Sequence, residues 1–408
     1  MSAALDTALA QGAGGPVRSA DDWVAWVWTE FLPGWLARVH DDQGGVFDTL
    51  AADGTPILVA EKTVLAQARI LFTLSHLALL SGDPALVAAA DHQAAFLPRF
   101  RKAPGLYRRA LRRDGSVTGL PGDEVARSYD QSFALLALAT WNRLSPRHET
   151  ATEIEACWSA LATTLTDPAT GLLLEDDTLT APAAPDAPLR AQNPHMHLYE
   201  ACLQAFEMTG NDLWQTRAAS LRALGLEHFL DTDTGSIAEF RAPDLGPLPG
   251  AAGARREPGH QCEWAWLLGR EAELGGDPAL RETAATLMAF ADRCGFSGAG
   301  PLKGAAFDAV SADGAVMEPS FLLWPQTEAI KALSLRHMAG EAAAGIRARA
   351  LLCLMFERWF AGHEAFVNQL DATGESLWSE APSRLLYHLA LALTEGARAG
   401  LWPGLPRQ

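Results

Sequence analysis

Hydrophobic and polar positions follow a pattern along this chain that repeats about every 65 residues. The segment Ser81–Leu86 recurs closely as Gly275–Leu280, and a looser copy lies at Thr209–Leu213. In these segments glycine suits the end of one helix, while Asp or Asn caps the next and Pro, where present, fits its first position. Extending the period in both directions places six such turns along the whole chain.

Each repeat is predicted to contain two helices. In the first repeat, the pattern predicts an amphipathic helix over Trp23–Val39 and a second helix over Glu61–Leu80 that is apolar on nearly all sides. A helix with one apolar stripe covers a surface, whereas one that is apolar on most sides is buried. Later second helices are expected at Asp123–Leu144, His195–Met208, His260–Leu274, Phe321–His337 and Arg384–Thr394.

Six outer–inner helical hairpins that close on themselves predict an all-α fold, the (α/α)6 barrel. We expect one catalytic domain over residues 1–408, with residues 1–18 as an N-terminal extension. Short pieces at Leu172–Leu174 and Ile237–Phe240 are predicted to form small hairpins. The longest Pro- and Gly-rich loops, Thr178–Pro194 and Ala242–Gly259, both precede a second helix, which places them at one mouth of the barrel.

The charge balance narrows the classes of partner. Lys and Arg total 32 against 49 Asp and Glu, a net charge of −17, which argues against nucleic acid and anionic membrane surfaces. Five widely spaced cysteines without a C-x-x-C pair argue against a disulfide framework or zinc knuckle. No signal-peptide pattern is evident, and no apolar stretch is expected to approach membrane-spanning length. We expect a cytoplasmic protein, monomeric or a small homo-oligomer, that binds a neutral small molecule.

Polar residues recur in phase on the predicted inner helices. One from each helix gives the set Arg69, Asp130, His197, His260, Trp324 and His388, at spacings of 61 to 67 residues. Buried polar groups cost free energy unless they are paired, so a ring of them at one depth is better suited to line a pocket for a polyol than to fill a core.

Two of these histidines have a carboxylate three residues later on the same helical face: His197 with Glu200, and His260 with Glu263. An imidazole beside a carboxylate suits proton transfer near neutral pH. For His195 and His197, helix capping and a structural hydrogen bond stay open as alternatives. A metal site from this pair is disfavoured, because residues two apart on a helix do not face one another.

Four motifs resemble the N-acylglucosamine 2-epimerase family, and most closely its aldose–ketose isomerase branch, which includes mannose isomerases. They are Asn193–His197, Glu257–Trp266, Leu323–Glu328 and Tyr387–His388, with Gln67–Arg69 and Tyr129–Phe133 in addition. The resemblance implies an (α/α)6 barrel that interconverts sugars at C1 and C2 without a metal or redox cofactor.

The resemblance also implies roles for individual residues. His388 would be the base that removes the C2 proton, and His260 would open the ring or act as a second acid/base. Arg69 would stabilise the enediolate oxygens, and Glu263 would orient His260. The sugar would contact Asn193, His197, Tyr129, Trp324, Gln326 and Glu200.

The predicted reaction is interconversion of D-mannose, and related aldoses such as D-lyxose, with the ketose, here D-fructose, through a cis-enediol(ate). The alternatives are a 2-epimerase acting on mannose, cellobiose or an N-acylhexosamine with two opposed histidines, and a glycoside hydrolase using two carboxylates from Asp130, Glu263 and Glu328. A carbohydrate-binding protein without turnover is the non-enzymatic alternative.

Overall fold

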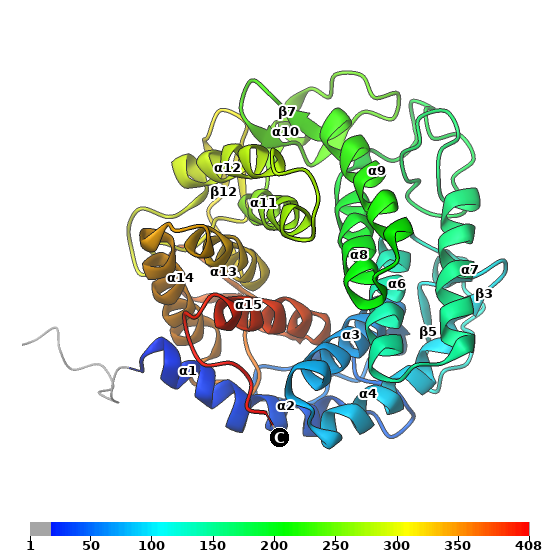
Figure 1. Cartoon of the computed structure of the whole chain (residues 1–408), viewed down its shortest axis with the longest axis horizontal. Coiled ribbons are helices and arrows are strands. Elements are labelled where there is room, and N and C mark those ends of the chain that lie inside the picture. Colours follow the sequence, from blue (N-terminus) through cyan, green and yellow to red (C-terminus); the bar gives the residue numbers. More distant parts are fainter. Residues whose placement is uncertain (1–17, 408) are drawn as a thin grey trace, which may run out of the picture.

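A computed structural model describes residues 18–407, and six inner helices surround the axis of a barrel while the other long helices cover them (Figure 1). The inner helices are α3 (Val64–Ser81), α6 (Ser128–Leu144), α8 (Asn193–Thr209), α11 (Pro258–Glu273), α13 (Leu323–Met338) and α15 (Leu386–Arg398). Each packs on the next, and α15 closes the ring against α3. The predicted (α/α)6 barrel is confirmed, and the inner helices begin within five residues of the predicted starts.

The outer layer begins with a helix that is continuous along the chain but changes its winding, as α1 (Ala20–Trp26), the π-helical η1 (Val27–Phe31) and α2 (Leu32–Val39). The other outer helices are α4 (Pro84–Phe96), α7 (His148–Thr164), α9 (Asp212–Phe229), α12 (Leu280–Phe290) with η3 (Ala291–Gly295), and α14 (Ala342–Met355) with η4 (Phe356–Phe360). The predicted extension at residues 1–18 lies outside the described residues except for Arg18.

The inner helix α3 shows why this layer is so apolar. Val64–Ser81 is long and apolar enough to cross a membrane, so the expectation that no stretch approaches that length is wrong. However, 83% of that stretch is buried inside the protein, because α4, α6 and α15 pack around it. Its composition therefore reflects a central position in the barrel.

Short antiparallel strands lie in the links between outer and inner helices, where some pair within one link and others pair with the link of a neighbouring repeat. The pairs are β1 (Thr49–Leu50) with β16 (Ala381–Pro382), β2 (Glu61–Thr63) with β5 (Ala110–Arg112), β3 (Arg101–Lys102) with β4 (Leu106–Tyr107), β6 (Arg190–Ala191) with β9 (Phe240–Arg241), and β7 (Leu230–Asp231) with β8 (Ser236–Ile237). Two triplets are β10 (Arg255–Arg256), β11 (Ala309–Ser311) and β12 (Val316–Glu318), and β13 (Phe321–Leu322), β14 (Gln369–Leu370) and β15 (Ser376–Trp378).

One of the two predicted hairpin segments forms strands, and both long loops contain short regular elements, with β6 in the loop at Thr178–Pro194. Ile237–Phe240 spans the end of β8 and the start of β9, whereas Leu172–Leu174 forms only a single bridge between Leu173 and Thr166. The loop at Ala242–Gly259 contains a short helix, α10 (Gly250–Ala254), and β10. The remaining short helices are η2 (Leu97–Phe100), α5 (Pro121–Glu124) and η5 (Ser383–Leu385).

A glutamine near the start of four inner helices fixes the preceding loop to the barrel. The side-chain amides of Gln67, Gln131, Gln261 and Gln326 each accept from the backbone N–H, and donate to the carbonyl, of one loop residue. In the third repeat His195 takes this position, and its Nε2 accepts from the backbone N–H of Leu173 at 2.8 Å. These contacts satisfy backbone groups that burial would otherwise leave unpaired.

Candidate active site

A cavity of about 250 Å³ lies where the inner helices begin. Its walls carry eight of the ten predicted site residues: Arg69, Tyr129, Asn193, His197, His260, Glu263, Trp324 and His388. The first turns of several inner helices point at this space, so their positive dipole ends favour negative charge there. The predicted ring of polar residues therefore does gather at one depth, although Asp130 does not line the cavity and its neighbour Tyr129 does.

The unprotonated nitrogen of His388 lies at the cavity wall, beside Arg69. Its Nδ1 lies 2.8 Å from a carboxylate oxygen of Glu328, and its Nε2 lies 3.3 Å from the Arg69 guanidinium. Because arginine only donates, Nε2 is the acceptor and Nδ1 carries the hydrogen. Burial lowers the pKa of His388 well below its usual value, and the Arg69 and Lys331 cations act in the same direction. His388 is thus a neutral imidazole whose unprotonated nitrogen faces the cavity, as a general base requires.

His260 has the opposite electrostatic environment. Its Nδ1 lies 2.7 Å from Glu239 and 3.3 Å from Glu257. Burial alone would lower the pKa of His260, but these two carboxylates outweigh it and raise the pKa to about 10. His260 is therefore an imidazolium, suited to donate a proton. Two imidazoles whose pKa values are driven apart in one cavity define an acid and a base.

The expectation that Glu263 orients His260 is wrong, because Glu239 does so instead. Glu239 lies in the link between β8 and β9, and its carboxylate also accepts from Gln192 and from the backbone of Glu257. Glu263 is fully buried, and neither of its oxygens has a hydrogen-bond partner among residues 18–407. Burial raises the pKa of Glu263 well above its usual value, and Glu328 adds to the rise. This rise favours the protonated form of Glu263, whose carboxyl group faces the cavity with its hydrogen-bonding capacity free.

Arg69 links the base to the opposite wall. One nitrogen contacts His388, and another donates to the Tyr129 hydroxyl at 2.8 Å. The guanidinium lies 4.0 Å from the centre of the Phe133 ring, a cation–π contact that holds it in place. A fixed arginine beside a base is well placed to stabilise an enediolate oxygen as negative charge develops.

Trp324 separates the two histidines. Its ring centre lies 4.8 Å from that of His260 and 6.0 Å from that of His388. A Cβ on Gly259 would lie 2.5 Å from a ring carbon of Trp324, so glycine at this position allows α11 to approach α13 closely. The indole therefore forms a flat wall on which a sugar can stack between acid and base.

Two predicted sugar contacts lie elsewhere. Gln326 is fully buried, and the loop backbone at Ala306 and the carbonyl of Leu322 occupy its amide, so it is a structural residue. Glu200 accepts from Tyr387 and pairs with His197 Nδ1 at 3.0 Å, below the cavity wall. Glu200 therefore orients His197 in the way that Glu328 orients His388.

A buried lysine completes the layer beneath the cavity. The Lys331 ammonium lies 2.6 Å from Glu328 and 3.9 Å from the centre of the Trp266 ring, and the side chain is fully buried. Burial raises the pKa of Glu328, and Lys331 opposes that rise. Lys331 thus favours the carboxylate form of the group that orients the base.

Sequence reasoning missed several residues that form or support the site: Glu239, Glu257, Asn368, Trp378, Arg384, Glu328 as a partner of His388, and Lys331. Asn368 is 3% exposed, lines the cavity and leaves its side-chain oxygen without a partner among the described residues. Most of these residues lie in loops or β-strands at the mouth, where no helical spacing connects them to the histidines.

Three groups of side chains within the described part of the chain place potential metal ligands close together. They are Glu239, Glu257 and His260; His197, Glu200 and Glu263; and Glu263, Glu328 and His388. In each group an imidazole Nδ1 already bonds a carboxylate. This pairing accounts for their proximity through hydrogen bonding between protein groups.

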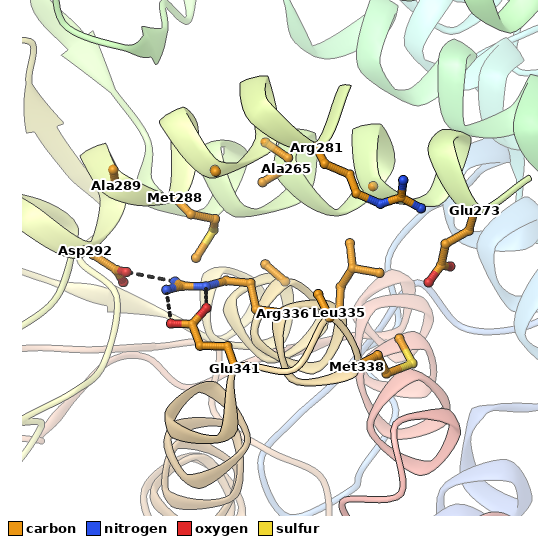
Figure 2. Close-up of a pocket in the computed structure, with 15 residues that line it drawn as sticks. Ala265, Glu273, Arg281, Met288, Ala289, Asp292, Leu335, Arg336, Met338 and Glu341 are labelled. Atoms are coloured by element: carbon orange, nitrogen blue, oxygen red, sulfur yellow. Dashed lines mark hydrogen bonds and ion pairs between the residues drawn. The ribbon is translucent and has the colours of Figure 1, made fainter. Parts of the chain in front are cut away.

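A larger cavity of about 500 Å³ lies between α11, α12 and α13, away from these histidines. Figure 2 shows its small apolar side chains, and the Asp292–Arg336–Glu341 ion pairs at its edge. It contains no imidazole, and Arg336 is already neutralised. The smaller cavity at the mouth is therefore the candidate active site.

The fold and this acid–base pair define an enzyme of the (α/α)6-barrel class. Residues 45–392 match the N-acylglucosamine 2-epimerase (GlcNAc 2-epimerase) family, and the chain belongs to that family. The chain is 30% identical to a mannose-6-phosphate isomerase of Rhizobium meliloti (strain 1021), over 92% of this chain and 96% of the relative. It is 26% identical to a D-mannose isomerase of Marinomonas mediterranea, over 73% of this chain and 76% of that protein.

A crystal structure of a D-mannose isomerase matches 94% of this chain and 100% of its own, with a TM-score of 0.81 and 21% identity. This likeness confirms the fold. Family membership and the relatives together identify a sugar isomerase or epimerase.

Proposed function

We propose that this protein is an aldose–ketose isomerase that interconverts D-mannose and D-fructose at C1 and C2. The observation that carries the proposal is the contrast between His388, a neutral base beside Arg69, and His260, an imidazolium held by Glu239. The name of one sequence relative, a D-mannose isomerase, supports mannose as the sugar, and the name of the other, a mannose-6-phosphate isomerase, supports a substrate with the mannose skeleton.

In the proposed reaction, His260 donates a proton to the ring oxygen as the bond between C1 and the ring oxygen breaks. The O1 hydrogen passes to solvent, which reprotonates His260, and O1 becomes the C1 carbonyl oxygen, to which Glu263 donates a hydrogen bond. His388 Nε2 then takes the C2 proton; the C–H electrons form the C1–C2 double bond, and O1 gains negative charge beside Arg69. His388 returns the proton to C1 as the C1–C2 double bond is lost, the O2 hydrogen passes to the O1 oxyanion, and C2 becomes the ketone. Each step uses a group in the required protonation state.

The contrast between a neutral His388 and a protonated His260 favours an isomerase over a 2-epimerase. An epimerase that runs in both directions needs each of two imidazoles to act as base in turn. The carboxylates of Glu239 and Glu257 hold the His260 proton, and this opposes such exchange. An isomerase needs a single base, because one proton moves between C2 and C1 on one face.

The arrangement of carboxylates gives little support to a glycoside hydrolase. Of the three expected candidates, only Glu263 lines the cavity, since Asp130 pairs with Arg127 at 2.9 Å and Glu328 with Lys331. Hydrolysis needs two carboxyl groups on opposite sides of the bond.

The experiment that tests the proposal compares the wild type with His388→Asn. Turnover of D-mannose to D-fructose should fall by about 10²–10⁴-fold, the usual contribution of a general base, while binding of the sugar measured by calorimetry is retained. A sugar-binding protein without turnover would show no ketose in either sample, and that result would contradict the proposal.

A further inference from the structure

A second guanidinium opens into the cavity without a carboxylate partner. Arg384 lies in η5, four residues before His388, and its side chain forms no ion pair or hydrogen bond within the described residues. Neighbouring arginines differ in this respect: Arg127 pairs with Asp130, and Arg255 with Glu257. Arg384 and Arg69 are thus two cations that line one cavity and lack a carboxylate to neutralise them.

The two cations repel each other, which makes this wall receptive to an anion. Burial lowers the pKa of Arg384, and Arg69 acts in the same direction. Asp48 attracts Arg384, but its carboxylate accepts hydrogen bonds from Thr63 and Gln67. An anion that contacts Arg384 would therefore relieve an unfavourable interaction as well as form charge-assisted hydrogen bonds.

The isomerisation of a neutral aldose does not use Arg384. The single negative charge that develops lies on the enediolate, where Arg69 is already in contact with His388. Arg384 lies in the 3-10 helix η5, four residues before His388 and ahead of the first turn of α15. Because η5 leads into α15 and the inner helices begin at the mouth, Arg384 lies nearer the mouth than His388, on the side that the end of a hexose remote from C1 would reach if C1 and C2 lay at His388.

The opposite wall does not suit an anion. An adjoining cavity of about 350 Å³ shares Tyr129, Asn193, Glu257 and His260 with the first. It also carries the carboxylates of Glu175 and Glu239, and its one arginine, Arg127, is neutralised by Asp130. Glu239 and Glu257 neutralise the His260 imidazolium, and repulsion from the carboxylates on this wall directs an anionic substituent toward Arg384.

We infer that Arg384 binds a phosphoryl group at the end of the sugar remote from C1, so that the preferred substrate is a phosphorylated aldose such as mannose 6-phosphate. This inference rests on the proposed isomerase. In this inference Arg384 is the residue that distinguishes the phosphorylated sugar from the free sugar. His388 and Arg69 act at C1 and C2, which are the same in both.

The test measures kcat/KM for D-mannose, mannose 6-phosphate and mannuronate with the wild type, Arg384→Met, Arg384→Lys and Arg147→Met. Arg147 is exposed and outside the cavity, so its variant controls for the loss of one charge. The wild type should prefer mannose 6-phosphate over mannose by at least tenfold. Arg384→Met should reduce that ratio by at least about 30-fold through KM, Arg384→Lys should retain part of it, and Arg147→Met should leave it unchanged.

Three results would overturn the inference: no preference for the phosphorylated sugar, an equal loss for mannose and mannose 6-phosphate in Arg384→Met, or an equal preference for mannuronate. Each leaves the isomerase proposal intact, because mannose still yields ketose. Binding of inorganic phosphate by calorimetry gives a readout that is independent of turnover: it should be present in the wild type and lost in Arg384→Met. If neither sugar is converted yet phosphate binds in this way, the isomerase proposal fails and the anion site stands.

Discussion

His388 donates its Nδ1 hydrogen to Glu328 at 2.8 Å, and this single hydrogen bond decides which imidazole nitrogen faces the cavity. Glu328 lies on α13 and His388 on α15, so the packing of two neighbouring inner helices sets the tautomer of the base. Arg69 contacts the other imidazole nitrogen, the unprotonated Nε2, and can donate to it only in this tautomer.

Replacing Glu328 by glutamine should therefore abolish most of the activity while preserving the shape of the site. The amide of Glu328→Gln can donate to Nδ1, which moves the hydrogen of His388 to Nε2 and removes the lone pair that takes the C2 proton. We expect kcat to fall by about 10³–10⁴-fold with sugar affinity retained, as for a wrong tautomer in a catalytic triad. Glu200→Gln, which alters the equivalent partner of His197, is the matched control and should cost less; an equal loss in both would contradict the assignment of His388.

Lys331→Met should destabilise the protein and reduce activity together. It leaves Glu328 buried without its cation, for which a loss of about 3–5 kcal/mol in the free energy of unfolding is typical. Urea denaturation and kcat measure the two effects. In the double variant Lys331→Met/Glu328→Gln stability should partly return, whereas activity should not; recovery of both would show that Glu328 has no role beyond pairing with Lys331.

The dependence of kcat/KM on pH should be flat through neutrality. His388 must be neutral, and its pKa lies well below 6.5, so activity is lost only at acidic pH. His260 must be protonated, so activity falls as the pH rises past about 10. Glu239→Gln removes an anion beside His260, which lowers the pKa of His260, so the fall in activity at alkaline pH should begin at a lower pH. Glu175→Gln, at a residue that forms no bond to His260, should leave that fall unchanged. If the alkaline fall in kcat/KM lay at the same pH in Glu239→Gln as in the wild type, His260 would be excluded as the acid.

Gln326→Leu should lower stability through the backbone and not through the site. It leaves the buried N–H and C=O of Ala306 unpaired, at a cost of about 1–3 kcal/mol for each group. Thermal unfolding should show a lower Tm, and Gln261→Leu should behave similarly because it breaks the same contact at Ile237. A rise in KM without loss of stability would instead return Gln326 to the sugar site.

The barrel could be predicted from the sequence because every repeat carries the same signals: a cap, a glycine or proline turn, and an inner helix apolar on most sides. The same period located His197, His260 and His388, which lie at equivalent depths. It also contained the glutamines at positions 67, 131, 261 and 326, whose regular spacing indicated a structural role for Gln326 that the family resemblance obscured.

Partners across the barrel could not be predicted in this way. Glu263 lies three residues after His260, yet Glu239, 21 residues earlier, bonds the imidazole, because a β-link folds over the start of α11. Likewise Glu328 meets His388 from a different helix, 60 residues away. Helical spacing identifies residues that share a face, whereas contacts between elements depend on loop geometry and on packing that the sequence pattern does not encode.

The most direct test of the central claim is to incubate EDTA-treated protein with D-mannose in D2O and follow the sugars by NMR. The account predicts D-fructose, with deuterium at C1 to the extent that the proton on His388 exchanges with solvent, and undiminished activity after chelation. Glucose appearing without fructose would contradict it and indicate a 2-epimerase with His260 and His388 as paired bases. Loss of activity with EDTA would require one of the three histidine–carboxylate groups to be a metal site.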